Sequence, residues 1–182
     1  FNGGDFDFGI SVFSSDGTTL EYSTYLGGTQ REYPHSIVTN EAGDIYVMGT
    51  SGSLDFPTTI DAFQADFNGG PFIDLGVNSF YGSFDAGCDI VISKINGITG
   101  ALDASTFVGG TDNDGLNLGA KLNYNYGDVC RGEINVDGTG DIWVASSTRS
   151  ADFPMVQAFD PALNGTCDAV VFRLNESLSE LE

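Results

Sequence analysis

Two stretches of similar sequence decide the fold: Leu20–Gly28 reads LEYSTYLGG, and Leu102–Gly110 reads LDASTFVGG. Each is rich in β-branched and aromatic residues and ends in two glycines, as expected of a β-strand running into a turn. A second motif, GDIYVMG at Gly43–Gly49, recurs as GDIWVAS at Gly140–Ser146. Because these matches come in one order along the chain, they indicate an internal repeat.

Shorter motifs recur in the same order and complete the repeat. The DFP tripeptide occurs at Asp55–Pro57 and Asp152–Pro154, and FNGG occurs at Phe1–Gly4 and Phe67–Gly70. A third type of run, read as DFGISVF, DIVISKI and DAVVFRL, begins at Asp7, Asp89 and Asp168. Each unit therefore holds four strand-like segments, the number in one blade of a β-propeller.

We name the four strands of a blade a, b, c and d in chain order. The expected strands are c 7–13, d 20–26, a 35–40, b 44–50, c 89–95, d 102–108, a 132–136, b 141–147 and c 169–174. The expected fold is all-β, with four-stranded antiparallel sheets in an incomplete ring of about two and a half blades. Residues 1–28 would form a half blade with strands c and d. Residues 29–110 would form a complete blade with an insertion at 71–86. Residues 111–182 would form a blade with an insertion at about 113–128, lacking most of its last strand.

Composition excludes two classes of partner. The chain of 182 residues carries a formal net charge of -20, from 26 acidic and 6 basic residues. Nucleic acid is therefore an unexpected partner, because binding to phosphate needs clustered Lys and Arg. No run approaches the roughly 20 apolar residues that span a bilayer, so membrane insertion is not expected. A hydrophobic fraction of 41% separates the chain from disordered acidic tails.

The ordered motifs resemble a known family. The string STYLGG, GDIYVMGTS, DFPTT, AFQ, FNGG and DIVISKIN resembles the repeat of the seven-bladed β-propeller family called SBBP, over nearly all of the chain except the two insertions. NYGD at 125–128 followed by RGE at 131–133 resembles the variant in large cell-surface proteins of gliding Bacteroidota. Those proteins leave the cell by type IX secretion, so the resemblance implies an extracellular or cell-surface location. It implies little about activity.

About two and a half blades cannot close a seven-bladed ring, and open blade edges favour aggregation. The expected partners are therefore other blades of a longer chain or other copies of this chain. A surface glycan or a protein is a further expected partner.

Both insertions are expected on one face of the propeller, because the d–a and b–c loops emerge on the same side. Their aromatic residues suggest a ligand-binding surface, or alternatively a small satellite core. The candidate ligand-binding residues are Phe72, Phe80, Tyr81, Phe84, Tyr124 and Tyr126.

Acidic residues crowd the same face and raise the question of calcium. The loop Thr111–Gly115 reads TDNDG, which resembles an oxygen-rich calcium loop without the full pattern and its closing Glu. Asp112 and Asp114 are the candidate ligands of Ca²⁺, and no motif requires another cofactor. By contrast, Asp7, Asp89 and Asp168 are each expected to cap a turn through backbone N–H groups. The DFP motifs are expected to be structural.

Three cysteines, Cys88, Cys130 and Cys167, leave at least one unpaired within the chain. Cys88 and Cys130 each close one insertion on the same face, whereas Cys167 precedes strand c of the following blade. Strands two apart are about 9–10 Å from each other, beyond the reach of a disulfide. A Cys88–Cys130 disulfide with Cys167 free is therefore predicted.

A non-enzymatic role as a structural or adhesive propeller segment is the leading interpretation. His35 is the only histidine, and no Ser or Cys arrangement accompanies it. A calcium-dependent glycan-binding face is the first alternative. The second alternative, a hydrolase or lyase, would need paired carboxylates about 5–10 Å apart in a cleft.

Overall fold

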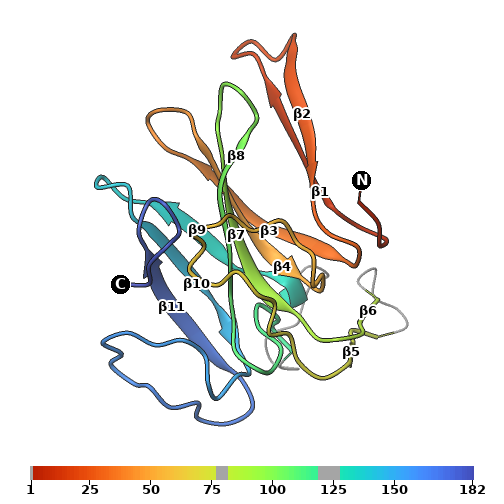
Figure 1. Cartoon of the computed structure of the whole chain (residues 1–182), viewed down its shortest axis with the longest axis vertical. Coiled ribbons are helices and arrows are strands. Elements are labelled where there is room, and N and C mark those ends of the chain that lie inside the picture. The colour runs from red at the N-terminus through yellow and green to blue at the C-terminus, as the bar shows by residue number, and fades with distance from the viewer. Residues whose placement is uncertain (1, 77–81, 119–127) are drawn as a thin grey trace.

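The computed structural model describes residues 2–76, 82–118 and 128–182. The described residues form antiparallel sheets and almost no helix, a result consistent with a partial β-propeller (Figure 1). None of the helices in those ranges is long and apolar enough to cross a membrane. The prediction of an all-β fold is confirmed.

Three sheets carry the repeat. The first sheet pairs β1 (Phe8–Phe13) with β2 (Leu20–Leu26). The second sheet has the order β3 (Glu32–Thr39), β4 (Ile45–Ser51), β7 (Asp89–Ile95) and β8 (Leu102–Val108). The third sheet has the order β9 (Glu133–Val136), β10 (Ile142–Thr148) and β11 (Asp168–Leu174). These strands coincide with the expected strands to within a few residues, and their order is a, b, c, d.

The insertions contribute only short elements. A hairpin of β5 (Ile73–Asp74) and β6 (Ser83–Phe84) forms a small sheet of its own. A single 3₁₀ turn, η1 (Asp128–Cys130), precedes β9. Both elements lie beside the end of the second sheet where the b–c connection begins, as Figure 1 shows for β5 and β6.

The sheets lie side by side, with the second between the first and the third (Figure 1). One core joins the first and second sheets and includes Phe8, Ile10, Val91 and Phe107. A second core joins the second and third sheets and includes Ile90, Ile92, Val144 and Phe172. Because side chains alternate along a strand, β7 supplies Val91 to one core and Ile90 and Ile92 to the other. The middle sheet is therefore buried on both faces.

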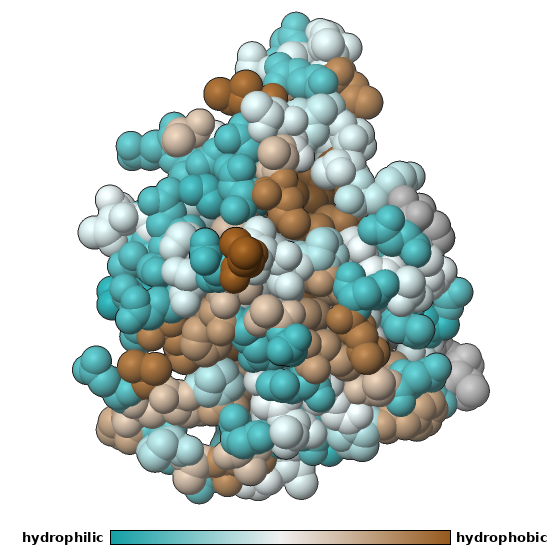
Figure 2. All heavy atoms as spheres, viewed as in Figure 1, coloured by the Kyte–Doolittle hydropathy of each residue, from teal (hydrophilic) through white to brown (hydrophobic). Residues whose placement is uncertain are grey.

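Hydrophobic side chains also reach the surface. Figure 2 shows apolar atoms on the viewed face, mostly in its middle and lower parts, among hydrophilic patches. Val171 of β11 is 71% exposed, whereas Ile92, which holds the same position in β7, is fully buried. The difference follows from packing, because the third sheet covers Ile92 and no described sheet covers Val171.

Replacing Phe107 by Ala tests the first core. The Phe107 side chain is fully buried, and its ring centroid lies 5.8 Å from that of Phe56 and 5.7 Å from that of Phe67. We expect Phe107→Ala to lower the free energy of unfolding by about 3–5 kcal/mol, because it opens a cavity. Denaturant unfolding measures the change. The control is Phe13→Ala, at a position 57% exposed, which should change little. Equal effects of the two variants would contradict this core.

Candidate functional site

The most unusual side chains are three carboxylates with no exposed surface: Glu32, Asp89 and Asp114. They lie where neighbouring sheets meet. We define the first junction as Asn2, Asp7, Gly27, Gly28, Glu32, Ser51, Ser53 and Asp55. The second junction is Asn68, Asp89, Gly109, Gly110, Asp114, Thr148, Ser150 and Asp152. The two junctions repeat the same contacts, so they form one type of site built twice.

In the first junction, hydrogen-bond donors of two segments surround Glu32. The backbone N–H of Gly28 donates to Oε2 at 3.1 Å. The hydroxyls of Ser51 and Ser53 donate to Oε1 at 2.7 and 2.5 Å. These bonds tie the end of strand d in one sheet to strand b and the b–c connection of the next sheet.

In the second junction, Asp114 takes the place of Glu32. The backbone N–H of Gly110 donates to Asp114 Oδ2 at 2.7 Å, and the Ser150 hydroxyl donates to the same oxygen at 2.9 Å. The Thr148 hydroxyl donates to Asp114 Oδ1. In both junctions the acid therefore stands four residues after the second glycine.

The aspartate at the start of strand c supplies the second carboxylate of each junction. Asp89 Oδ2 accepts the backbone N–H groups of Asn68 at 2.8 Å and Gly69 at 3.0 Å. Asp7 Oδ2 accepts the backbone N–H of Asn2 at 2.9 Å. These bonds confirm the expected capping role of these aspartates.

In each junction, an asparagine side-chain amide also donates a hydrogen bond to a glycine carbonyl. Asn2 Nδ2 donates to the carbonyl of Gly27 at 2.9 Å, and Asn68 Nδ2 donates to the carbonyl of Gly109 at 3.2 Å. The asparagine of the FNGG motif therefore holds the first glycine of the following Gly-Gly pair.

The aspartate of the DFP motif accepts a hydrogen bond from the residue after the Gly-Gly pair. Asp55 Oδ1 accepts the backbone N–H of Thr29 at 2.8 Å, and Asp152 Oδ1 accepts that of Thr111 at 2.9 Å. Hydrogen bonding to these backbone groups lowers the pKa of Asp55 and of Asp152. Both aspartates are therefore held as carboxylates, as a structural role of the motif requires.

The first glycine is required because two carboxylates meet beside it. A Cβ on Gly27 would lie 2.6 Å from both Asp7 Oδ1 and Glu32 Oε2. A Cβ on Gly109 would lie 2.5 Å from Asp89 Oδ1 and 2.9 Å from Asp114 Oδ2. Any side chain at these positions would push the two carboxylates apart.

In each junction, one oxygen of the strand-c aspartate lacks a hydrogen bond. Asp7 Oδ1 and Asp89 Oδ1 are buried and have no hydrogen-bond partner among the described residues. Each lies beside the same glycine as an oxygen of the second carboxylate, so a proton on one of the two acids would allow the missing hydrogen bond.

Burial also favours the protonated forms of Glu32, Asp89 and Asp114. It raises the pKa of Glu32 and of Asp114, and the neighbouring Asp7 carboxyl raises the pKa of Glu32 further. Burial, with the charge of Asp114 nearby, raises the pKa of Asp89 to about 7. The site therefore favours proton uptake by a buried pair of acids.

The geometry at Asp112 and Asp114 does not fit the predicted calcium site. Asp114 is buried in the second junction, where protein donors occupy both of its oxygens. Asp112 Oδ1 instead accepts the Asn113 backbone N–H at 2.7 Å and lies 3.7 Å from Arg149 Nε. In the ranges that the structure describes, no three His, Cys, Asp or Glu side chains group as a metal site would require.

The predicted aromatic surface divides between two environments. Phe72 is 62% exposed, whereas Phe84 is only 2% exposed. Phe84 packs in a third core with Tyr33, Cys88 and Leu116, so its assignment to a ligand-binding surface is wrong. The alternative of a satellite core holds for this residue. Phe80, Tyr81, Tyr124 and Tyr126 lie outside the described residues.

The predicted Cys88–Cys130 disulfide is wrong in this structure, where Cys88, Cys130 and Cys167 are free thiols. The expected proximity holds, since Cys88 and Cys130 pack in the same third core. The Cys88 thiol, however, is engaged with the 113–114 segment. Its Sγ lies 3.6 Å from Asn113 Oδ1 and 3.5 Å from the Asp114 carbonyl oxygen.

Sequence reasoning missed Glu32 and the role of Asp114. The two acids are of different type, and Asp114 lies within the predicted insertion at about 113–128, which hides their equivalence in the sequence. A signal was present in the spacing, because an acidic residue follows the second glycine by four positions in both repeats.

The carboxylate pair predicts a pH dependence of stability. The native pKa of Asp89 is about 7, above the value of about 4 for an unfolded aspartate. The native state therefore binds more protons between pH 4 and 7. The contribution of Asp89 to the free energy of unfolding consequently falls as pH rises through this range and is constant above it.

Asp89→Asn isolates that contribution. Its carbonyl oxygen can accept the bonds from Asn68 and Gly69, and its amide can donate to Asp114 Oδ2. We expect the variant to be more stable than the wild type by about 1–3 kcal/mol at pH 8, and by much less at pH 4. Denaturant unfolding across this range measures the difference. Asp66→Asn, at an exposed position, is the control. A difference independent of pH would show that the pair does not share a proton.

Thiol reactivity tests the free cysteines. Burial raises the pKa of Cys88 well above its ordinary value and that of Cys130 to about 12. Cys167 is only partly buried. Because the thiolate is the reactive form, we expect iodoacetamide at pH 8 to modify Cys167 first in the native protein. Peptide mass mapping under non-reducing conditions identifies the site, with the unfolded protein as control. A Cys88–Cys130 crosslink would contradict the structure.

Comparison with known proteins agrees with the fold. The family model described as the SBBP beta-propeller repeat matches residues 21–57, from strand β2 through the first DFP motif. No curated protein matches the chain. The matched residues of the first junction are Gly27, Gly28, Glu32, Ser51, Ser53 and Asp55. The beta-propeller repeat match therefore includes most of the first junction.

Proposed function

We propose that this chain is a non-enzymatic structural or adhesive segment of a β-propeller in a large secreted or cell-surface bacterial protein. In this proposal, residues 1–28, 29–110 and 111–182 are successive blade units. Their partners are other blades of a longer chain or other copies, and the outer face is available to a surface glycan or protein.

One observation carries the structural role: the buried carboxylates serve to join blades. Glu32 and Asp114 accept hydrogen bonds from backbone N–H and hydroxyl groups of the two sheets that meet at each junction, and Asp89 Oδ2 accepts two backbone N–H groups. Pairs of acids that act on a substrate need an opening between them, whereas here Gly27 and Gly109 fill that position. The site is thus suited to holding sheets together.

The charge of the chain supports a location outside the cell. A formal net charge of -20 keeps a protein soluble and repels other polyanions. The resemblance to surface proteins noted above points in the same direction.

Labelling of intact cells tests the location. We expect antibodies raised against the 182-residue chain to label unbroken cells that produce the protein. Antibodies against a cytoplasmic protein, which should label only after permeabilisation, provide the control. Labelling of the chain that requires permeabilisation would contradict the proposal.

A glycan array separates a structural from a glycan-binding role. We expect any glycan signal of the chain to be the same in millimolar calcium and in chelator. Saturable binding that the chelator abolishes would instead favour a calcium-dependent glycan-binding face.

A further inference from the structure

In the second junction, two buried carboxylates are held by neutral donors. Asp89 and Asp114 have no exposed surface, and their carboxylates meet beside Gly109. The donors to Asp89 are two backbone N–H groups, and those to Asp114 are the Gly110 N–H and two hydroxyls. If both acids were ionised, these donors would bring no positive charge to offset the repulsion between them.

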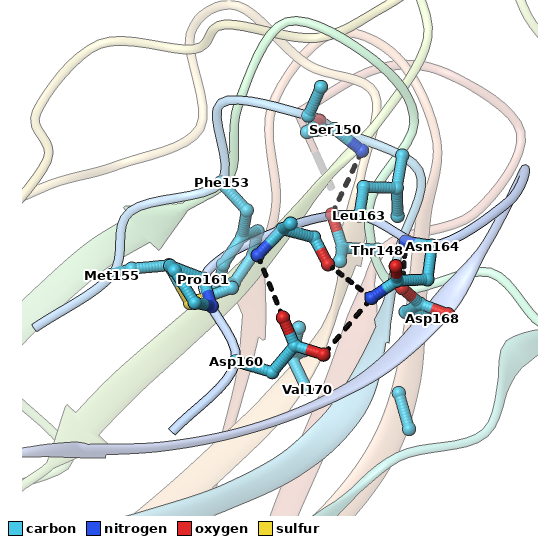
Figure 3. Close-up of a pocket in the computed structure, with 13 residues that line it drawn as sticks. Thr148, Ser150, Phe153, Met155, Asp160, Pro161, Leu163, Asn164, Asp168 and Val170 are labelled. Atoms are coloured by element: carbon cyan, nitrogen blue, oxygen red, sulfur yellow. Dashed lines mark hydrogen bonds between the residues drawn. The ribbon is translucent and has the colours of Figure 1, made fainter. Parts of the chain in front are cut away.

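The two hydroxyl donors come from the end of β10 and the residues that follow it. The Thr148 hydroxyl donates to Asp114 Oδ1, and the Ser150 hydroxyl donates to Oδ2. Figure 3 shows that the Ser150 N–H in turn donates to the Thr148 hydroxyl oxygen, at 2.9 Å. Both oxygens of Asp114 therefore have donors, whereas Asp89 Oδ1 is buried and has none in the described ranges.

The surrounding elements also favour a proton on the pair. The titratable groups that face it are Cys88, Asp112, Arg149, Asp152 and Cys167. The Arg149 guanidinium lies toward Asp112, with 3.7 Å between Nε and Oδ1. Asp152 adds a negative charge that raises the pKa of Asp89 further. Burial raises the pKa of both thiols, so they stay uncharged at neutral pH.

Asp114 belongs to a loop, residues 111–118, which we call the junction segment. The Asp114 N–H donates to the Cys88 carbonyl, and the Gly115 N–H donates to the Ser147 carbonyl, both at 2.8 Å. By contrast, β4 and β7 pair over seven residues and are buried in the two large cores. A loop tied at separate points can open while such sheets remain folded.

Cys88 lies against the junction segment. Its side chain is fully buried, with Sγ 3.6 Å from Asn113 Oδ1 and 3.5 Å from the Asp114 carbonyl oxygen. Leu116 of the segment packs with Cys88 in the third core. Movement of the segment away from β7 would therefore expose the Cys88 thiol.

We propose that the Asp89–Asp114 pair is a pH-sensitive switch. One proton on the pair closes the junction segment onto the second and third sheets, and loss of that proton opens the segment and exposes Cys88. The switch is independent of the location and the partners proposed above, because it concerns only contacts between described residues.

The direction and size of the effect follow from proton binding. The closed state holds the proton, so it is favoured at acid pH, and the open population rises with pH. The pKa of Asp89 is about 7 in the closed state and should return to about 4 once water reaches it. We expect the open population to rise about 50-fold from pH 5 to pH 7 and only about twofold from pH 7 to pH 8.

Labelling of Cys88 in the full chain measures the opening. The reagent is dithiodipyridine, and peptide mass mapping separates Cys88 from Cys130 and Cys167. The rate in the wild type is divided by the rate in Asp89→Asn at the same pH, which removes the ionisation of the thiol itself. In this variant the amide can donate to Asp114 Oδ2, so closure needs no proton. We expect the ratio to rise about 50-fold from pH 5 to pH 7.

Two further variants complete the comparison. Asp114→Asn forms the reciprocal pair, in which the amide would donate to Asp89 Oδ1, and its labelling should follow that of Asp89→Asn. Asp66→Asn, at an exposed position, should follow the wild type. A ratio that stays constant from pH 5 to pH 8 would overturn the switch.

Hydrogen exchange separates local opening from unfolding. The amides of Asp114 and Gly115 should exchange faster than those of β4 at every pH. A low concentration of urea should accelerate exchange in β4 alone, because local opening exposes little surface. Equal protection and equal urea dependence in the two places would show that Cys88 is reached only through global unfolding, and the switch would be wrong.

Calcium provides the remaining test. We expect the labelling rate of Cys88 at pH 8 to be the same in millimolar calcium and in chelator. Slow labelling that requires calcium would overturn the switch, because the pair would then hold a cation in place of a proton. None of these results bears on the labelling of intact cells, which tests the proposed location separately.

Discussion

The structure depends on the meeting of two carboxylates beside a glycine where one sheet joins the next. Asp89 and Asp114 converge at Gly109, and Asp7 and Glu32 converge at Gly27. Burying two acids together is costly unless hydrogen bonds or a proton compensate their charge. Each junction supplies donors from the strand end, from strand b and from the connection after it. These donors come from both sheets, so each junction links the two.

This arrangement makes each blade incomplete by itself. The asparagine and the strand-c aspartate come from one sheet, whereas the second acid, the hydroxyls and the DFP aspartate come from the next. Asn164 and Asp168 repeat the asparagine and the aspartate of the two junctions, and the Asn164 N–H donates to Asp168 Oδ2 at 2.6 Å. Val171 lies on a face of β11 that no described sheet covers.

The junction also explains which site predictions succeeded. Capping by Asp7 and Asp89 could be predicted, because both aspartates begin the same repeated run, although the capped asparagine precedes Asp7 by 5 residues and Asp89 by 21. The role of Asp114 could not, because its partners Thr148 and Ser150 lie far along the chain. Because Asp114 lies in a loop of oxygen-bearing residues, it was predicted to be a ligand of Ca²⁺. Its burial among protein donors assigns it to the junction.

The sequence by itself determined the strands, their order and the antiparallel sheets, because alternating apolar residues and recurrent glycines act locally and repeat. Only the tertiary structure decided which side chains those sheets bury. Phe84 resembled a surface aromatic, yet it packs in a core with Tyr33 and Cys88. Cys88 and Cys130 do share that core, but the Cys88 thiol is engaged with Asn113 and Asp114. Such choices depend on distances and directions between segments far apart in the chain, which the order of residues does not specify locally.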